Sequence, residues 1–148
     1  MIERTEDVAF LKGIAAHPAI WPWMSEEGMS PVEYGPLIHP MVHYLRFGDR
    51  GFFAFRMMNC VMYDSHVAML PHTRADEAAK AAIQWMWRNT PAEKLVAYLP
   101  MDNRHAIRFA KRAGYREEGR LSAAFRGRGA LLDLIVLGVS KCQTLQGV

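Results

Sequence analysis

The segment from Asp102 to Gly119 constrains the fold more than any other part of the chain. Apolar side chains recur in it at positions i, i+3, i+4 and i+7, as on one buried face of a helix: Ala106, Phe109, Ala110 and Ala113. Asp102 or Asn103 can cap the start of this helix, because a short polar side chain there accepts a backbone N–H. Gly114 suits the left-handed position that ends a helix. Tyr115 follows at once and begins a strand, so the segment predicts a tight helix-to-strand connection.

Hydrophobic patterning along the rest of the chain predicts alternating helices and strands. The predicted helices cover residues 5–16 and 75–88, with a short turn of helix at 25–28. Thr5 and Thr73 are the expected caps of the two longer ones. One strand begins at 115, and the others cover residues 41–47, 52–58, 61–69, 95–99 and 130–139. The last strand is rich in Leu, Ile and Val, which predicts burial on both faces. The order of elements predicts one α/β domain over residues 1–148, with a mixed central sheet flanked by helices.

Charge and hydropathy narrow the class of partner. The formal net charge is +3 and the basic residues are dispersed, whereas nucleic-acid binding usually needs a basic cluster. The denser basic run at residues 120–128 fits a solvated hairpin. No apolar run is long enough to span a bilayer, and the charged N-terminus lacks the pattern of a signal peptide. We therefore expect a cytoplasmic protein with neither a membrane nor a nucleic acid as partner.

The chain also offers little for metal binding. Cys60 and Cys142 lack the paired spacing of a zinc site, and two free thiols fit a reducing compartment. His39 and His43 are four residues apart, but Pro40 between them prevents the helix that would place them on one face. We therefore expect no metal.

The pattern Asn103-x-x-Ala-x-x-Phe109-x-x-x-x-Gly114-Tyr115-x-x-Glu-Gly119 resembles the C-terminal half of the GCN5-related N-acetyltransferase (GNAT) family. The predicted order of elements over residues 5–140 is also similar to that family's fold. In the family, acetyl-CoA lies where two neighbouring parallel strands splay apart, with its pyrophosphate on backbone N–H groups at a helix N-terminus. The resemblance implies a GNAT-like mixed α/β fold. It also implies an acyl-CoA-dependent N-acetyltransferase that acts on an unknown amine.

The same resemblance implies a phosphate-binding loop after the strand that ends at Met69. The family pattern Arg/Gln-x-x-Gly-x-Gly/Ala aligns with residues 74–79, where Arg74 and Ala79 match and Glu77 replaces the middle glycine. Because a carboxylate at this point repels phosphate, we expect weakened or abolished acetyl-CoA binding. The residues that the resemblance assigns to acetyl-CoA are Met69, Leu70, Arg74, Ala75, Asp76, Glu77, Ala78, Ala79, Asn103, Ala106 and Phe109.

Two catalytic roles also follow from the resemblance. The general base commonly lies on the strand before the phosphate loop, where Asp64 and His66 are the candidates. An imidazole changes charge near neutral pH, which suits a base. The acid is commonly a Tyr on the last helix, but Ala110 stands at that position and cannot donate a proton. Tyr115 is expected to pack in the core.

Two functional hypotheses stay open. The chain is an N-acetyltransferase, or it is a GNAT-like domain that has lost acetyl transfer and serves as a binding, regulatory or assembly protein, for example of a phage or mobile element. An enzyme needs an open cleft beside Met69, whereas the degenerate form predicts a filled cleft with Arg74 folded onto Asp76 or Glu77. Trp85 and Trp87 point to different sides of their helix, so one of them is expected at a surface. A homodimer or a protein partner fits either hypothesis.

Overall fold

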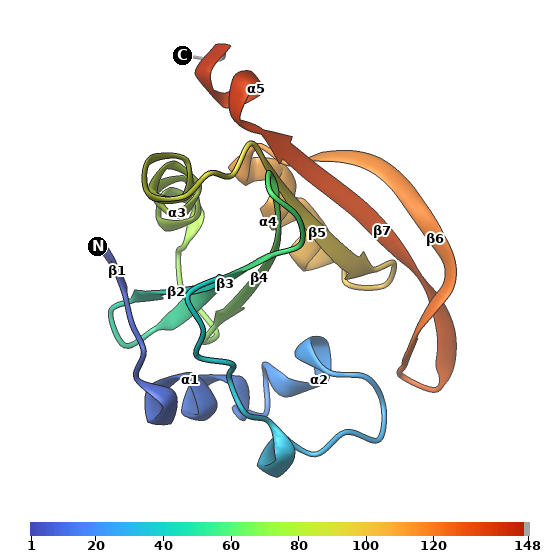
Figure 1. The fold of residues 1–148 in the computed structure, drawn as a ribbon. Coiled ribbons are helices and arrows are strands. Elements are labelled where there is room, and N and C mark those ends of the chain that lie inside the picture. Colours follow the sequence, from blue (N-terminus) through green and yellow to red (C-terminus); the bar gives the residue numbers. More distant parts are fainter. Residues whose placement is uncertain (147–148) are drawn as a thin grey trace.

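A mixed sheet of seven strands, in the order β1-β2-β3-β4-β5-β7-β6, organises the chain in a computed structural model that describes residues 1–146 (Figure 1). The strands are β1 Ile2–Arg4, β2 Val42–Phe47, β3 Gly51–Met57, β4 Met62–Met69, β5 Lys94–Pro100, β6 Arg116–Gly127 and β7 Ala130–Ser140. The helices are α1 Val8–Ala15, α2 Trp21–Met24, the 3-10 helix η1 Pro31–Glu33, α3 Asp76–Asn89, α4 Arg104–Ala113 and α5 Lys141–Gln146.

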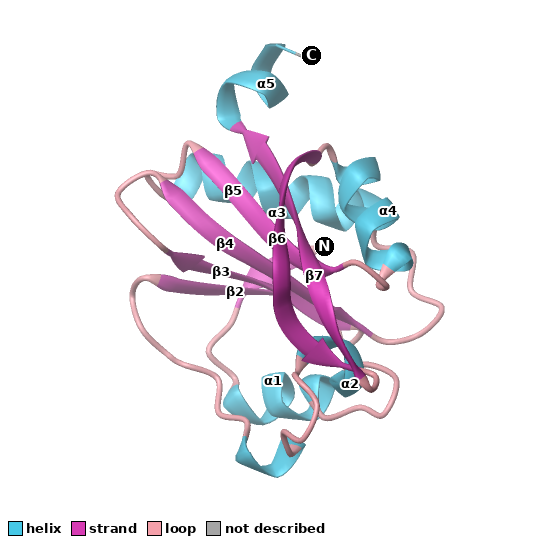
Figure 2. Ribbon diagram, turned by 90° about the vertical axis from the view of Figure 1, so that its right-hand side faces the viewer, coloured by secondary structure: helices cyan, strands magenta, loops and turns pink. Residues whose placement is uncertain are grey.

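Each face of the sheet is covered by its own set of helices (Figure 2). Helices α3 and α4 pack on one face, where Ala82, Met86 and Leu95 are completely buried. Helix α1 packs on the other face, where Leu11 is completely buried against β2, β3 and β4. A ligand that passes through the sheet would therefore meet two different apolar layers.

The sheet opens between β4 and β5. These two strands pair in parallel from Met62 and Lys94 only as far as Asp64 and Val96. Both strands continue beyond that point, β4 to Met69 and β5 to Pro100, without further pairing between them. The backbone edge of β4 from residue 65 onward therefore has no strand partner on the side of β5, which is the geometry of a cleft cut into a sheet.

Helix α4 forms as the sequence predicts. The side chain of Asn103 accepts a hydrogen bond from the backbone N–H of Ala106, at 3.3 Å, and caps the first turn. Gly114 ends the helix with φ of 113°, a conformation that costs a side chain energy but costs glycine little. Tyr115 follows and is buried, so the prediction that it packs in the core is confirmed.

Several local predictions were wrong. The first helix begins at Val8 with Asp7 as its cap, because the preceding residues form β1 against β2. Thr73 does not cap α3, since its hydroxyl accepts a hydrogen bond from Arg50 instead. The second short helix lies at Trp21–Met24 rather than at 25–28.

The last hairpin also differs from its prediction. Strand β6 extends to Gly127, and β7 is buried only in its second half. The two strands run past the rest of the sheet as an arm (residues 119–134), because β5 pairs with β7 only from Leu134 onward. The basic run 120–128 lies in this largely solvated hairpin, as predicted. Trp87 is buried and Trp85 is half-buried against the core, so neither makes the exposed partner surface that was expected.

Candidate active site

A cavity of about 810 Å³ occupies the place where β4 and β5 diverge. Its lining comes from both faces of the sheet: α3 and α4 contribute on one side, and the α2 segment and the arm contribute on the other. On the side of α3 and α4 the lining includes Ala75, Ala79, Ala106 and Phe109. On the opposite side it includes Ile20, Trp23, Met24 and Phe125. Two reactants can therefore approach one point from opposite faces of the sheet.

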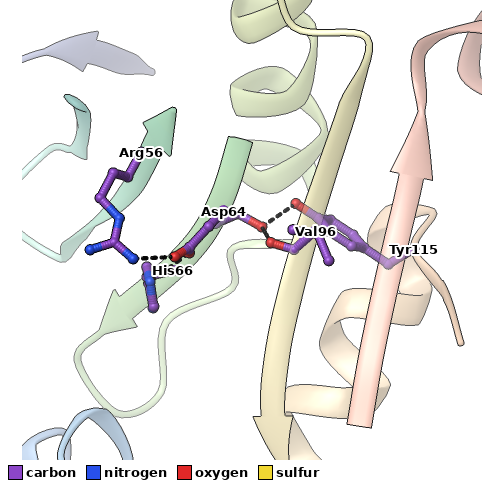
Figure 3. Close-up of polar contacts among 6 residues, drawn as sticks. Arg56, Asp64, His66, Val96 and Tyr115 are labelled. Carbon is purple, nitrogen blue, oxygen red and sulfur yellow. Dashed lines mark hydrogen bonds and ion pairs between the residues drawn. The ribbon is translucent and has the colours of Figure 1, made fainter. Parts of the chain in front are cut away.

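A hydrogen-bonded pair of hydroxyl groups closes the vertex of the divergence. The hydroxyl of Ser65 donates to the backbone oxygen of Val96 at 2.9 Å and lies 2.8 Å from the hydroxyl of Tyr115. Because the single proton of Ser65 is used on Val96, Tyr115 donates its own proton to Ser65. Burial raises the pKa of Tyr115 to about 12, although the hydrogen bond with Ser65 opposes the rise and the Asp64 charge adds to it. Tyr115 thus stays protonated and fixes the vertex (Figure 3).

Asp64 and His66 meet on the face of the sheet opposite α3 and α4 (Figure 3). His66 Nε2 lies 2.7 Å from Asp64 Oδ1, although the two groups are not aligned as a straight hydrogen bond. Arg56 Nη2 donates to Asp64 Oδ2 at 2.9 Å. His66 lines the cavity with an exposed side chain, whereas the buried Asp64 lies behind it. His66 therefore faces the cavity, and the Asp64 carboxylate contacts its imidazole from behind.

The charge state of Asp64 follows from these contacts. Burial alone would raise the pKa of Asp64, but the contacts with His66 and Arg56 together outweigh burial, and the pKa lies below its ordinary value. Asp64 is therefore a carboxylate at neutral pH and a poor proton acceptor. Of the two candidate bases, the geometry favours His66, with Asp64 as its partner.

The N-terminus of α3 presents unused backbone donors. The N–H groups of Asp76, Glu77 and Ala78 donate no hydrogen bond within residues 1–146, and the first bond of the helix runs from Ala79 N to Ala75 O at 2.8 Å. Such groups, together with the helix dipole, form a site for an anion. Arg50 holds the preceding loop through hydrogen bonds to the backbone oxygen of Pro71 (2.9 Å) and the hydroxyl of Thr73 (3.0 Å).

The negative charges of the two carboxylates in the first turn of α3, Asp76 and Glu77, are partly offset by neighbouring cations. Asp76 forms an ion pair with Arg112 of α4 at 3.1 Å, and Glu77 lies 3.5 Å from Lys80, with its side chain 90% exposed. Glu77 is thus well hydrated, so water and salt screen its repulsion of a phosphate. Arg74 does not fold onto Asp76 or Glu77 in residues 1–146, and the cleft is open rather than filled. The structural signature expected of a degenerate domain is therefore missing from this part of the chain.

The residues that the sequence assigned to acetyl-CoA divide into two groups. Those that line the cavity are Met69, Leu70, Ala75, Ala79, Asn103, Ala106 and Phe109. Arg74, Asp76, Glu77 and Ala78 lie at the start of α3 outside the lining. Sequence patterns missed His72, Arg104 and His105, which line the cavity and add basic groups beside it. The pattern of α4 could have pointed to Arg104 and His105, since they directly follow the cap Asn103.

The sequence predicts neither a membrane-spanning helix nor a metal site, and the structure describes residues 1–146. Residues 1–146 contain no helix that is both long and apolar enough to cross a membrane. The same residues contain no cluster of three or more His, Cys, Asp or Glu side chains placed to bind a metal. The cytoplasmic location and the oligomeric state stay predictions.

The fold and the opened sheet define a class of proteins. The chain has the fold of the GNAT acyl-CoA N-acyltransferases, with a mixed seven-stranded sheet flanked by helices, so the fold predicted from the sequence is confirmed. No protein-family model and no curated protein sequence matches the chain.

Solved acetyltransferase structures are similar over nearly the whole chain. A spermidine N-acetyltransferase from Vibrio cholerae, in complex with CoA and spermine, superposes with a TM-score of 0.81 at 16% identity over 98% of this chain and 97% of its own. A ribosomal-protein-S5-alanine acetyltransferase from Vibrio fischeri superposes with a TM-score of 0.74 at 12% identity over 94% of this chain and 91% of its own. At these identities the similarity shows the fold alone.

Proposed function

We propose that this chain is an acyl-CoA-dependent N-acyltransferase that moves an acetyl group from acetyl-CoA to an amine. The observation that carries the proposal is the open cavity at the divergence of β4 and β5, which is lined from both faces of the sheet. The CoA bound in the similar Vibrio cholerae structure supports acyl-CoA as the cosubstrate. Both solved relatives modify amines, which supports an amine acceptor.

In the proposed complex, acyl-CoA lies on the side of α3 and α4. Its pyrophosphate binds the free N–H groups of Asp76, Glu77 and Ala78, because an anion is stabilised there by orphan donors and the helix dipole. The pantetheine amides extend β4 along the edge that has no strand partner after Asp64. Arg104 and His105 supply positive charge for the remaining phosphate. The thioester then lies near the vertex closed by Ser65.

The acceptor amine reaches the thioester from the opposite face, past His66. His66 accepts a proton from the incoming ammonium, and the carboxylate of Asp64 stabilises the imidazolium that results. The neutral amine nitrogen then attacks the thioester carbonyl carbon, so that a C–N bond forms and the C–S bond breaks. The extra proton on the attacking nitrogen passes to the departing thiolate, which leaves as free CoA thiol. This route needs no separate acid, and it explains how Ala110 is tolerated on α4.

The degenerate-domain alternative retains one supporting observation. Asp76 and Glu77 place two carboxylates in the turn that would bind phosphate, and no glycine brings the backbone close there. The alternative predicts a GNAT-like fold that binds a protein instead of a cosubstrate.

The decisive experiment is an assay of free CoA thiol released from acetyl-CoA in the presence of a pool of primary amines, with the acetylated product identified by mass spectrometry. We expect release that depends on both protein and amine, and its loss in Ala106→Trp, where the indole fills the cavity beside α4. Ala124→Trp is the matched control, since Ala124 is exposed on the arm and outside the cavity lining. If no amine in the pool stimulates release, the transferase proposal fails.

A further inference from the structure

We propose that the acceptor is a primary amine with an aromatic or other apolar group and no second positive charge. This inference rests on the proposed function and specifies its substrate class. Three features of the acceptor side lead to it: an aromatic wall, a docked arm that holds this wall in place, and the pairing of the cavity-lining Asp102 with Arg128.

Trp23 from α2 and Phe125 from the arm form the aromatic wall of the cavity on the acceptor side. Ile20 and Met24 continue the wall with aliphatic surface and pack with the core layer below α1. An apolar group that enters between these side chains loses contact with water and gains contacts on both sides. A chain of spaced ammonium groups would lose hydration there and gain little.

A bulge in β6 turns Phe125 toward the cavity. Leu121 pairs with Leu134 and Phe125 pairs with Leu132, so three residues of β6 face the single residue Asp133. Asp133 holds this bulge, because its carboxylate accepts hydrogen bonds from the backbone N–H of Ala123 (2.9 Å) and from Arg120 (2.6 Å). Bulges commonly redirect a side chain, and this one places the Phe125 ring at the cavity.

Arg128 fastens the tip of the arm to the rest of the wall. Its guanidinium carbon lies 4.3 Å from the centre of the Trp23 ring. The same group donates to both carboxylate oxygens of Asp102, at 2.6 and 2.8 Å, and to the backbone oxygen of Pro22 at 3.0 Å. The backbone N–H of Glu27 also donates to Arg126 O, at 2.9 Å. In Figure 2 the tip of the β6–β7 hairpin accordingly lies beside α2. The aromatic wall is thus held in place from both sides.

The acidic group that lines the cavity is already paired with a cation. Asp102 is the one acidic residue that lines the cavity within residues 1–146, and the bidentate hydrogen bond from Arg128 lowers its pKa and occupies both of its oxygens. Glu26 and Glu27 accept hydrogen bonds from backbone N–H groups of the arm, each at 3.0 Å. Asp64 is paired with Arg56 and His66. A second ammonium group inside the cavity would therefore meet a carboxylate that Arg128 already occupies, and would lie near the Arg128 cation.

The test compares phenethylamine, butylamine and spermidine as acceptors at saturating acetyl-CoA, with release of free CoA thiol as the readout. We expect kcat/KM for phenethylamine to exceed that for spermidine by about tenfold or more, with butylamine between them. A kcat/KM for spermidine equal to or above that for phenethylamine would overturn the inference.

Failure of the inference is separable from failure of the proposed function. Binding of each amine to the CoA-loaded protein is measured by calorimetry, which needs no turnover. If no amine is acetylated but phenethylamine binds and spermidine does not, the transferase proposal falls and the apolar-amine site stands. If spermidine binds at least as tightly as phenethylamine, the inference falls whatever the assay shows.

Separate variants test the aromatic wall and the pairing of Asp102 with Arg128. Phe125→Ala should raise KM for phenethylamine by about tenfold and leave KM for acetyl-CoA unchanged, because the ring contacts only the acceptor side. Leu121→Ala is the matched control on the same arm, with its side chain exposed and outside the cavity lining. Arg128→Gln frees Asp102 and should bring kcat/KM for spermidine closer to that for phenethylamine. An unchanged ratio in both Phe125→Ala and Arg128→Gln would contradict the proposed wall.

Discussion

His66 Nε2 lies 2.7 Å from Asp64 Oδ1, and we propose separate roles for these two side chains. Although burial opposes its charge, Asp64 remains a carboxylate, because it contacts His66 and accepts a hydrogen bond from Arg56. His66 lies at the cavity, where we propose that it accepts a proton from the acceptor amine. Tyr115 has a third role, since its protonated hydroxyl holds Ser65 at the vertex instead of titrating.

Replacement of His66 tests the assignment of the base. We expect His66→Ala to lower kcat by about a hundredfold or more and to leave KM for acetyl-CoA unchanged, because the histidine acts on the acceptor. Tyr115→Phe serves as the comparison: kcat should fall by less than about threefold, and unfolding should cost roughly 1 kcal/mol less, since only one hydrogen bond is lost. Steady-state kinetics and chemical denaturation supply the readouts. A larger loss of kcat in Tyr115→Phe than in His66→Ala would reverse the two roles.

The lowered pKa of Asp64 predicts that the stability of the fold depends on pH. Its pKa in the folded chain lies below the ordinary value of about 3.9, so its ionised form stabilises the fold fully above that ordinary pKa, and this stabilisation is lost as pH falls toward the folded pKa. We expect Asp64→Asn to be less stable than wild type by about 1–2 kcal/mol at pH 7, with the difference shrinking below about pH 4.

Urea denaturation at several pH values between 3 and 7 measures this difference in the free energy of unfolding. Asp49→Asn is the control, because Asp49 is exposed in the turn between β2 and β3 and forms no ion pair within residues 1–146. A gap between wild type and Asp64→Asn that stays constant down to pH 3 would show that the ionised carboxylate is not the source of the stabilisation.

At the scale of elements, sequence predicted best where the signals are local. The cap Asn103 and the terminator Gly114 define α4 from within its own residues. Strand β1 has three residues and depends on β2 for its pairing, so its own sequence carried little signal. The length of β6 was missed because its residues are almost all exposed and carry no apolar alternation.

The same distinction explains what could be predicted of the site. Asp64 and His66 were candidates because they lie on the strand that precedes the predicted phosphate-binding loop. Arg56 was not, since only the register of β3 against β4 brings it opposite Asp64. Arg128 was missed for a similar reason: its partners Asp102 and Trp23 lie far from it in the sequence.

Close contact between β3 and β4 predicts a strong effect at Gly51. A Cβ atom there would lie 2.1 Å from the backbone oxygen of Ala68 and 2.8 Å from the Cα of Met69, so the strands must move apart. We expect Gly51→Ala to lower the free energy of unfolding by about 3 kcal/mol. Thermal and urea unfolding measure the loss. Gly35→Ala should have little effect, because nothing lies within 4 Å of its added Cβ; equal stability of the two variants would contradict the packing described.

At the scale of the whole molecule, two apolar layers meet at one opening in the sheet. Helices α3 and α4 supply a layer with free helix amides and basic groups at its edge. Helix α2 and the arm supply a layer with an aromatic wall, and Arg128 of the arm pairs with Asp102. In the proposed complex, this arrangement keeps the anionic cosubstrate apart from an apolar acceptor and lets both reach the vertex near Ser65. Glu77 and Ala110, which differ from the family pattern, both lie in the layer of α3 and α4, and neither fills the opening.

Titration calorimetry with acetyl-CoA, on the wild type and on Glu77→Gly, tests the central claim most directly. We predict that the wild type binds one acetyl-CoA per chain with a Kd of about 1–100 μM, which is within the usual range of KM values for enzymes. Glu77→Gly should bind less than about tenfold more tightly, because the Glu77 side chain is exposed, screened and close to Lys80. Absence of binding by the wild type, with binding gained in Glu77→Gly, would show that the cosubstrate site is closed and would contradict the account.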